Sequence, residues 1–227
     1  MHTTEVKLSV NEQTQVSALM QSPDNARSCL VLAHGAGADM HHAFMTAVAG
    51  DLERARIATL RFQFPYTEQQ AKRPDPPALC HATVRAAAAA AHALSPSIPL
   101  FAGGKSFGGR MTSQAQAKVP LTHVRGLVFF GFPLHPAKQP SIDRAAHLFD
   151  VKIPMLFLQG TRDALAELPL IEPLVQQLGE RATLALIEDA DHSFHVPARS
   201  GRTDAHVRQE MAETCAAWAD SVLKERG

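Results

Sequence analysis

The stretch Leu100-Phe101-Ala102-Gly103-Gly104-Lys105-Ser106-Phe107-Gly108-Gly109-Arg110-Met111 decides the fold. In it, a short apolar run meets two glycines, then a serine after one lysine, then further glycines and helix-forming residues. This order predicts a strand that turns sharply into a helix, with the serine at the turn. Because glycine carries no Cβ, the glycines on either side let the neighbouring strand and helix approach closely. We therefore expect the hydroxyl of Ser106 to stand above the end of a sheet.

Two patterns overlap in this stretch. Gly104-Lys105-Ser106-Phe107-Gly108 fits G-x-S-x-G, the pattern of a nucleophile elbow. Gly104-Lys105-Ser106 also matches the end of a phosphate-binding loop, G-x-x-x-x-G-K-[ST], but that motif needs a glycine where Pro99 stands. A third interpretation is a glycine-rich strand-to-helix loop without chemistry. The rest of the chain favours the elbow.

The length and amino-acid composition limit the classes of protein to which this chain can belong. The 227 residues suffice for one α/β domain spanning 1–227. The net charge is zero and no basic stripe stands out, so no nucleic-acid partner is predicted. No run approaches the ~20 apolar residues of a membrane span, and no secretory signal begins the chain, so a cytoplasmic protein without a membrane partner is expected. Cys29, Cys80 and Cys215 fit no zinc or redox spacing and are predicted to be buried thiols.

Strand-like and helical patterns alternate along the chain. Runs at 6–10 and 14–19, split by a turn, predict an antiparallel hairpin at one sheet edge. Apolar runs predict strands at 29–33, 57–61, 99–103, 124–130, 153–159 and 183–187. Helical spacing predicts helices at 42–55, 80–94, 107–118, 171–178 and 207–222. This alternation predicts an α/β fold, with a mainly parallel sheet of about seven or eight strands and helices on both faces.

Four polar segments follow strands of this sheet, where active groups of α/β proteins gather. They are His34-Gly35-Ala36-Gly37, Ser106, Asp163 and His192, and the last three stand in the order serine, aspartate, histidine. A serine needs an adjacent base, a histidine with a pKa near ~6.5 can be that base, and a carboxylate fixes the imidazole tautomer. We therefore predict that Ser106, Asp163 and His192 are catalytic.

Each assignment has alternatives. Asp163 also fits a helix N-cap, with Glu167 and Asp191 as rival acids, and His195 competes with His192 as the base. The amides of Phe107 and Ala36 are the expected oxyanion-hole donors, with Gly35 or Gly37 as substitutes for Ala36. His34 is expected to brace its loop by hydrogen bonds.

Other residues near these segments receive weaker predictions. Phe64 and Tyr66 are candidates for a substrate pocket, although core packing explains such aromatic residues equally well. Lys105 is expected to pair with a carboxylate, with attraction of an anionic substrate as the alternative, and Arg110 to be solvated or ion-paired. The twelve histidines show no metal-ligand spacing, so neither a metal nor a cofactor is predicted.

Four segments together carry a resemblance to a known family: Leu32-Ala33-His34-Gly35-Ala36-Gly37, Arg61-Phe62-Gln63-Phe64-Pro65-Tyr66, Gly103-Gly104-Lys105-Ser106-Phe107-Gly108-Gly109-Arg110 and Asp191-His192-Ser193-Phe194. They resemble the small α/β-hydrolases of the testis-expressed-protein-30-like group, which are similar to the dienelactone hydrolase branch. The resemblance implies the α/β-hydrolase fold, with Ser106, Asp163 and His192 at the triad positions. The dienelactone branch carries cysteine where Ser106 stands, so dienelactone hydrolysis is not implied.

These observations predict a serine hydrolase that cleaves small acyl esters or related compounds through an acyl-enzyme intermediate. The segment Leu134–Lys152 is too short for a large lid domain, so an open site and compact acyl substrates are expected. Some relatives in the group act within larger complexes with no established catalysis. The alternative is therefore a non-catalytic binding or scaffold protein on the same fold.

Overall fold

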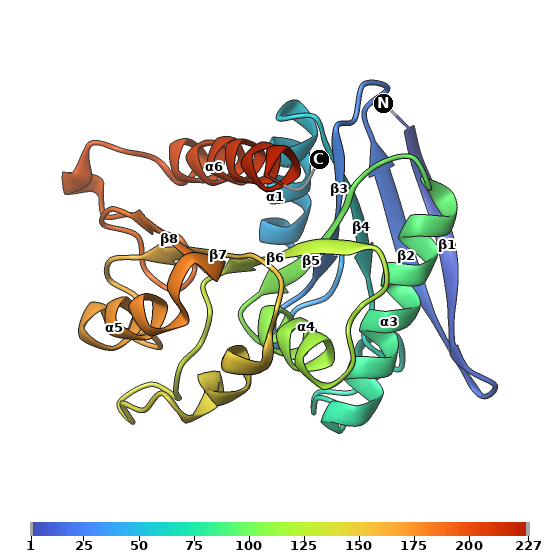
Figure 1. Cartoon of the computed structure of the whole chain (residues 1–227), viewed down its shortest axis with the longest axis horizontal. Helices are drawn as coiled ribbons and strands as arrows, with labels where there is room; N and C mark the ends of the chain where they lie inside the picture. Colours follow the sequence, from blue (N-terminus) through green and yellow to red (C-terminus); the bar gives the residue numbers. More distant parts are fainter. Residues whose placement is uncertain (1, 226–227) are drawn as a thin grey trace.

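The computed structural model describes residues 2–225, which contain one eight-stranded sheet (Figure 1). The strands are β1 (His2–Asn11), β2 (Thr14–Ser22), β3 (Ser28–Ala33), β4 (Ile57–Phe62), β5 (Leu100–Lys105), β6 (Val124–Phe130), β7 (Met155–Gly160) and β8 (Ala182–Ile187). Their order across the sheet is β1-β2-β4-β3-β5-β6-β7-β8. β2 pairs antiparallel with β1 and β4, and the other neighbours are parallel. The predicted edge hairpin and mainly parallel sheet are confirmed.

Helices cover both faces of this sheet. The α-helices are α1 (Ala43–Arg54), α2 (Pro65–Glu68), α3 (Pro77–Leu94), α4 (Phe107–Lys118), α5 (Leu168–Leu178) and α6 (Asp204–Lys224), and the 3-10 helices are η1 (Asp143–Asp150), η2 (Gly179–Arg181) and η3 (Ala198–Ser200). Figure 1 shows α1 and α6 on one face and α3, α4 and α5 on the other. Every helix within residues 2–225 is too short or too polar to cross a membrane.

The two faces of the sheet bury separate apolar clusters. In β3, Leu30 and Leu32 pack with the cluster under α1 and α6, whereas Cys29, Val31 and Ala33 pack with the cluster under α3 and α4. Successive side chains of a strand point to opposite faces, so a strand covered on both sides must be apolar throughout. This is why the continuous apolar runs of the sequence predicted the central strands.

The segment after β6 contains no lid within the described residues. Its one helical element is η1, whose buried Ala145 and Leu148 hold it against α4. After β4 the chain forms the four-residue helix α2, which starts at a proline and which the sequence did not predict. Four residues are too few for an apolar repeat to reveal a helix.

Glycines allow the close approach of β5 and α4 to their neighbours. A Cβ on Gly103 would stand 1.8 Å from the carbonyl oxygen of Val128 in β6. A Cβ on Gly104 would stand 2.4 Å from the carbonyl oxygen of Ala33, and one on Gly108 would stand 2.5 Å from that same oxygen. The glycines around Ser106 are therefore required by backbone contacts on β3 and β6.

We expect Gly103→Ala to lower the free energy of unfolding by about 3 kcal/mol, because the added methyl group meets rigid backbone on β6. Gly50→Ala is the matched control. A Cβ at Gly50 in α1 meets nothing closer than an Arg54 side-chain nitrogen at 3.8 Å, so it should stabilise the protein by about 0.5–1 kcal/mol. Urea unfolding of the three proteins measures both effects. Equal unfolding midpoints for Gly103→Ala and the parent would contradict the packing argument.

Candidate active site

Ser106 occupies a strained turn between β5 and α4. Its backbone has φ 49° and ψ −114°, a region that non-glycine residues enter at a cost of about 1–3 kcal/mol. The amide of Ser106 donates to the carbonyl of Phe130 at 3.1 Å, and the amide of Arg110 donates to the carbonyl of Ser106 at 3.1 Å. The glycine contacts on both sides and these hydrogen bonds hold the turn in place.

Asp163 follows β7 and is 2 % exposed. Its Oδ2 accepts a hydrogen bond from Gln159 Nε2 at 2.5 Å, and its Oδ1 accepts one from the amide of Leu165 at 2.8 Å. The Oε1 atom of Gln159 in turn accepts from the amide of Phe132 at 2.9 Å. A buried carboxylate needs such donors, and here they fix its orientation.

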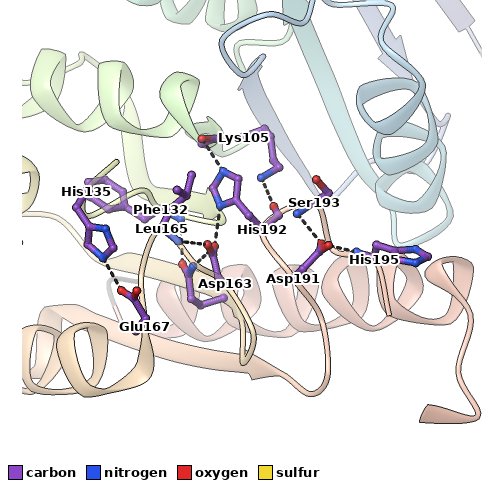
Figure 2. Close-up of polar contacts among 12 residues, drawn as sticks. Lys105, Phe132, His135, Asp163, Leu165, Glu167, Asp191, His192, Ser193 and His195 are labelled. Atoms are coloured by element: carbon purple, nitrogen blue, oxygen red, sulfur yellow. Dashed lines mark hydrogen bonds and ion pairs between the residues drawn. The ribbon is translucent and has the colours of Figure 1, made fainter. Parts of the chain in front are cut away.

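His192 connects the other two predicted catalytic side chains. Its Nδ1 lies 2.7 Å from Asp163 Oδ2, and its Nε2 lies 2.8 Å from Ser106 Oγ. Figure 2 shows the Asp163 carboxylate below the imidazole of His192. Because an ionised carboxylate only accepts, Nδ1–H donates to Asp163, and Nε2 is left to accept from the serine hydroxyl. The structure therefore brings a hydroxyl, an imidazole and a carboxylate into one hydrogen-bonded series.

The rival acids and the rival base have other partners. Asp191 Oδ1 accepts from the amides of Ser193 and His195 at 2.8 and 3.0 Å, which shapes the loop that carries His192. Glu167 Oε2 lies 2.5 Å from Nε2 of the buried His135.

His195 is exposed and lies apart from the series of three side chains. Its Nδ1 atom lies 2.9 Å from Asp204 Oδ2, and this hydrogen bond raises the pKa of His195.

His34 braces the loop after β3, as its position in the sequence predicted. It is fully buried, its Nδ1 lies 2.9 Å from the carbonyl of Gly35, and its Nε2 accepts from the amide of Phe64 at 3.2 Å. One ring nitrogen must therefore donate and the other accept, which requires a neutral imidazole. Burial lowers the pKa of His34 and favours that form.

A cavity of about 420 Å³ opens beside Ser106 and His192. Its lining residues are Gly35, Ala36, Gly37, Ala38, His42, Phe44, Met45, Lys105, Ser106, Leu165, His192 and Ser193. Phe44, Met45 and Leu165 give it an apolar wall, and all twelve residues lie outside the segment 134–152. Ala36 is among the lining residues, and Phe107, as the first residue of α4, has an amide without an acceptor inside its helix.

The aromatic residues predicted for the pocket lie elsewhere. Phe64 is fully buried in the core, where its ring contacts those of His34 and Phe107 at centroid distances of 5.0 and 5.6 Å. Tyr66 is 2 % exposed and lines a neighbouring cavity of about 680 Å³. Core packing, the alternative explanation for such aromatic residues, describes Phe64.

Two cationic residues of the elbow also differ from expectation. Lys105 Nζ donates to the backbone carbonyl of His192 at 2.5 Å instead of pairing with a carboxylate. Arg110 lies over the Phe107 ring at 5.8 Å, and its buried Nε has no hydrogen-bond partner among residues 2–225. The sequence predicted a solvated or ion-paired Arg110. Its side chain is half-buried, burial lowers its pKa, and it forms no ion pair with a carboxylate among residues 2–225.

Sequence reasoning missed the residues that hold Asp163. Gln159 carried one visible signal, because it is a polar side chain in the otherwise apolar run of β7. The amide of Leu165 carried none, since any residue at that position supplies the same donor. Phe44 and Met45 lie in the predicted helix 42–55, and only the structure shows that both line the cavity.

Comparison with solved structures shows the same fold in several proteins. The chain is 20 % identical to an α/β serine hydrolase without lid from Xanthomonas campestris, with a TM-score of 0.74 over 96 % of this chain and 95 % of that one. It is 23 % identical to a dienelactone hydrolase from Anabaena variabilis, with a TM-score of 0.73 over 93 % and 95 % of the two chains. An esterase domain from Rhodothermus marinus is 15 % identical, with a TM-score of 0.71 over 96 % and 98 %.

The sequence itself gives the family. The sequence model of the alpha/beta hydrolase domain family matches residues 26–220, and this range includes β3, Ser106, Asp163 and His192. The chain therefore belongs to the alpha/beta hydrolase domain family.

Proposed function

We propose that this protein is a serine esterase that cleaves small acyl esters or related acyl compounds. The observation that carries the proposal is the pair of hydrogen bonds joining Ser106 Oγ to His192 Nε2 and His192 Nδ1 to Asp163 Oδ2. The adjoining cavity supplies room for a substrate. The family and the structural neighbours described as serine hydrolases and esterases support the same reaction class.

In the first half of the reaction, Ser106 Oγ attacks the acyl carbonyl carbon while its proton passes to His192 Nε2. The carbonyl oxygen becomes an oxyanion, which the amides of Phe107 and Ala36 stabilise. Asp163 stabilises the imidazolium. His192 then gives its proton to the leaving oxygen, the carbon–oxygen bond breaks, and an alcohol departs from the acyl-enzyme.

In the second half, water takes the place of the alcohol. His192 Nε2 removes a proton from the water as the oxygen attacks the acyl carbon. When the second tetrahedral intermediate collapses, the bond to Ser106 Oγ breaks and His192 returns the proton to that oxygen. A carboxylic acid leaves and the enzyme is restored.

The cavity argues for a compact acyl group. Its volume of about 420 Å³ lies in the lower part of the ~300–1,000 Å³ range of small-molecule sites. Phe44, Met45 and Leu165 offer apolar contacts, and the absence of a lid within residues 2–225 leaves the entrance open. Short acyl chains such as acetyl and butyryl fit these features.

We also propose a narrower grouping and a location for the protein. The resemblance of four motifs supports a grouping with the testis-expressed-protein-30-like hydrolases, and Ser106 argues against dienelactone chemistry of the cysteine type. The proposed location is the cytoplasm, because Cys29, Cys80 and Cys215 are buried free thiols, and burial raises the pKa of each to about 12.

We expect a fluorophosphonate probe to label the folded protein at Ser106, because an activated serine oxygen displaces fluoride from the phosphorus atom. Mass spectrometry of proteolytic fragments identifies the labelled residue. Heat-unfolded protein is the control, since unfolding separates Ser106 from His192 and should prevent labelling. If well-folded protein stays unlabelled, the catalytic proposal falls and the binding or scaffold alternative replaces it.

A further inference from the structure

Lys105 makes a contact that the proposed mechanism does not use. It is the last residue of β5 and directly precedes Ser106. Its Nζ donates to the backbone carbonyl of His192 at 2.5 Å (Figure 2). The same nitrogen lies 5.8 Å from the ring centre of Phe44 and 5.2 Å from that of Phe194. One side chain thus joins the strand of the nucleophile to the loop of the base.

The loop that carries His192 needs such support. It contains two non-glycine residues with positive φ, Asp189 at 60° and Phe194 at 62°, which flank the turn around His192. Left-handed backbone costs free energy in non-glycine residues and persists only where surrounding contacts impose it. The hydrogen bond from Lys105 reaches the middle of this strained segment.

Space for the Lys105 ammonium is created by Gly131 at the end of β6. A Cβ on Gly131 would stand 3.1 Å from Lys105 Nζ and 3.5 Å from both Nδ1 and the carbonyl oxygen of His192. Gly131 also has φ 70°, so its backbone and its missing side chain both favour glycine. The ammonium and the imidazole of His192 therefore share one confined space.

We propose that Lys105 is a positioning residue for this reaction. Its ammonium holds the backbone of His192 against the strand that ends in Ser106, and it thereby fixes the distance between Ser106 Oγ and His192 Nε2. The proposal rests on the proposed esterase function. It predicts that loss of the ammonium misplaces the base while substrate binding in the cavity is largely kept.

The charges around Lys105 make its role sensitive to pH. Burial lowers the pKa of Lys105 to about 8, and the negative charges of Asp163 and Asp191 oppose that shift. Within residues 2–225, the titratable groups around the ammonium are Asp163, in the loop after β7, and Asp191 and His192, in the loop after β8. Above about pH 8 the ammonium loses its proton, and a neutral amine is a weaker donor to the carbonyl of His192.

The effect of the Lys105 charge on the free energy of unfolding distinguishes a positioning role from a stabilising role. A lysine pKa that is depressed in the folded state means that burial of the charge costs stability below about pH 8. That cost disappears as the pH rises from about 8 toward the ordinary lysine value. An apolar replacement removes the same cost, so it should not unfold the protein.

The test compares Lys105→Met, Lys105→Arg and Lys152→Met with the parent enzyme on p-nitrophenyl acetate. Lys152 is a matched control, because its Nζ also donates to a backbone carbonyl, that of Phe149 at 3.2 Å, and neither residue lines the cavity. Steady-state rates between pH 6 and 10 give kcat and KM, and thermal melts give stability. Fluorophosphonate labelling reports on Ser106 in each protein.

We expect Lys105→Met to lower kcat about 10- to 100-fold with KM changed less than about twofold, because small misplacements of a catalytic group have effects of this size. Its melting temperature should stay within about 3 °C of the parent. Lys105→Arg should recover part of kcat. The parent should lose rate above pH 8, and Lys105→Arg should not, since arginine stays charged. Lys152→Met should match the parent.

Three outcomes would overturn the proposal. One is parental kcat in Lys105→Met, and another is the same alkaline decline in all four proteins. The third is a fall of kcat accompanied by a melting temperature lower by more than about 10 °C, which would make Lys105 a stabilising residue only. If the parent itself neither hydrolyses the ester nor takes the label, the esterase function fails, and the role of Lys105 fails with it.

Discussion

Ser106→Ala is expected to lower kcat/KM for p-nitrophenyl acetate and butyrate by about 10⁴-fold or more, because it removes the atom that attacks the carbonyl carbon. The oxyanion donors and the cavity remain, so a small residual rate over that of water is expected. Initial rates at matched protein concentration measure the effect. The fold should persist, since alanine occupies the position and the glycine contacts around it are unchanged.

The control for Ser106→Ala is Ser221→Ala. Ser221 lies in α6, where its hydroxyl donates to the carbonyl of Trp218 at 2.8 Å and touches nothing of the site. This variant should keep parental rates within about twofold. Hydrolysis by Ser106→Ala at the parental rate would exclude Ser106 as the nucleophile, and with it the proposed mechanism.

Asp163→Asn is expected to lower kcat by about 10⁴-fold. The side-chain nitrogen of asparagine donates to His192 Nδ1, so Nδ1 must accept and cannot keep its hydrogen. The proton moves to Nε2, which can no longer accept the proton of Ser106. The substitution also removes the negative charge that stabilises the imidazolium of His192 during the reaction.

Glu167→Gln is the control for Asp163→Asn, since Glu167 is the rival acid that lies against His135. It should change kcat by less than about threefold, because it does not contact His192. Steady-state kinetics of both variants at pH 7 give the comparison, and circular dichroism confirms that both are folded. Nearly parental kcat in Asp163→Asn together with a large loss in Glu167→Gln would reverse the assignment of the acid.

Most of the fold could be predicted because its signals are local. Continuous apolar runs reveal strands that are buried on both faces, and α4 and β6 begin and end at the predicted residues 107–118 and 124–130. The short helices could not be found in this way. α2 and the 3-10 helices within residues 2–225 are held by proline, turns and contacts with distant residues, which leave no repeat in the sequence.

The candidate site could likewise be predicted only in part. Ser106, Asp163 and His192 could be brought together from the sequence, since each follows a strand of one parallel sheet. Their catalytic roles stay predictions, but the geometry that those roles require is present. Partners that depend on side-chain direction could not be deduced. Lys105 was expected to pair with a carboxylate and instead bonds to a carbonyl. Phe64 was a candidate for either the pocket or the core, and it lies in the core.

The position of β8 in the sheet determines one way in which the proposed activity can be lost. It is one of the two edge strands of the sheet and pairs with β7 alone. His192 follows this edge strand, whereas Ser106 follows β5 in the interior of the sheet. Local separation of β8 from β7 would move the imidazole of His192 away from Ser106 while the other strands stayed paired. The proposed activity therefore depends on an edge strand, and a protein whose other strands all stay paired can still lack a correctly placed base.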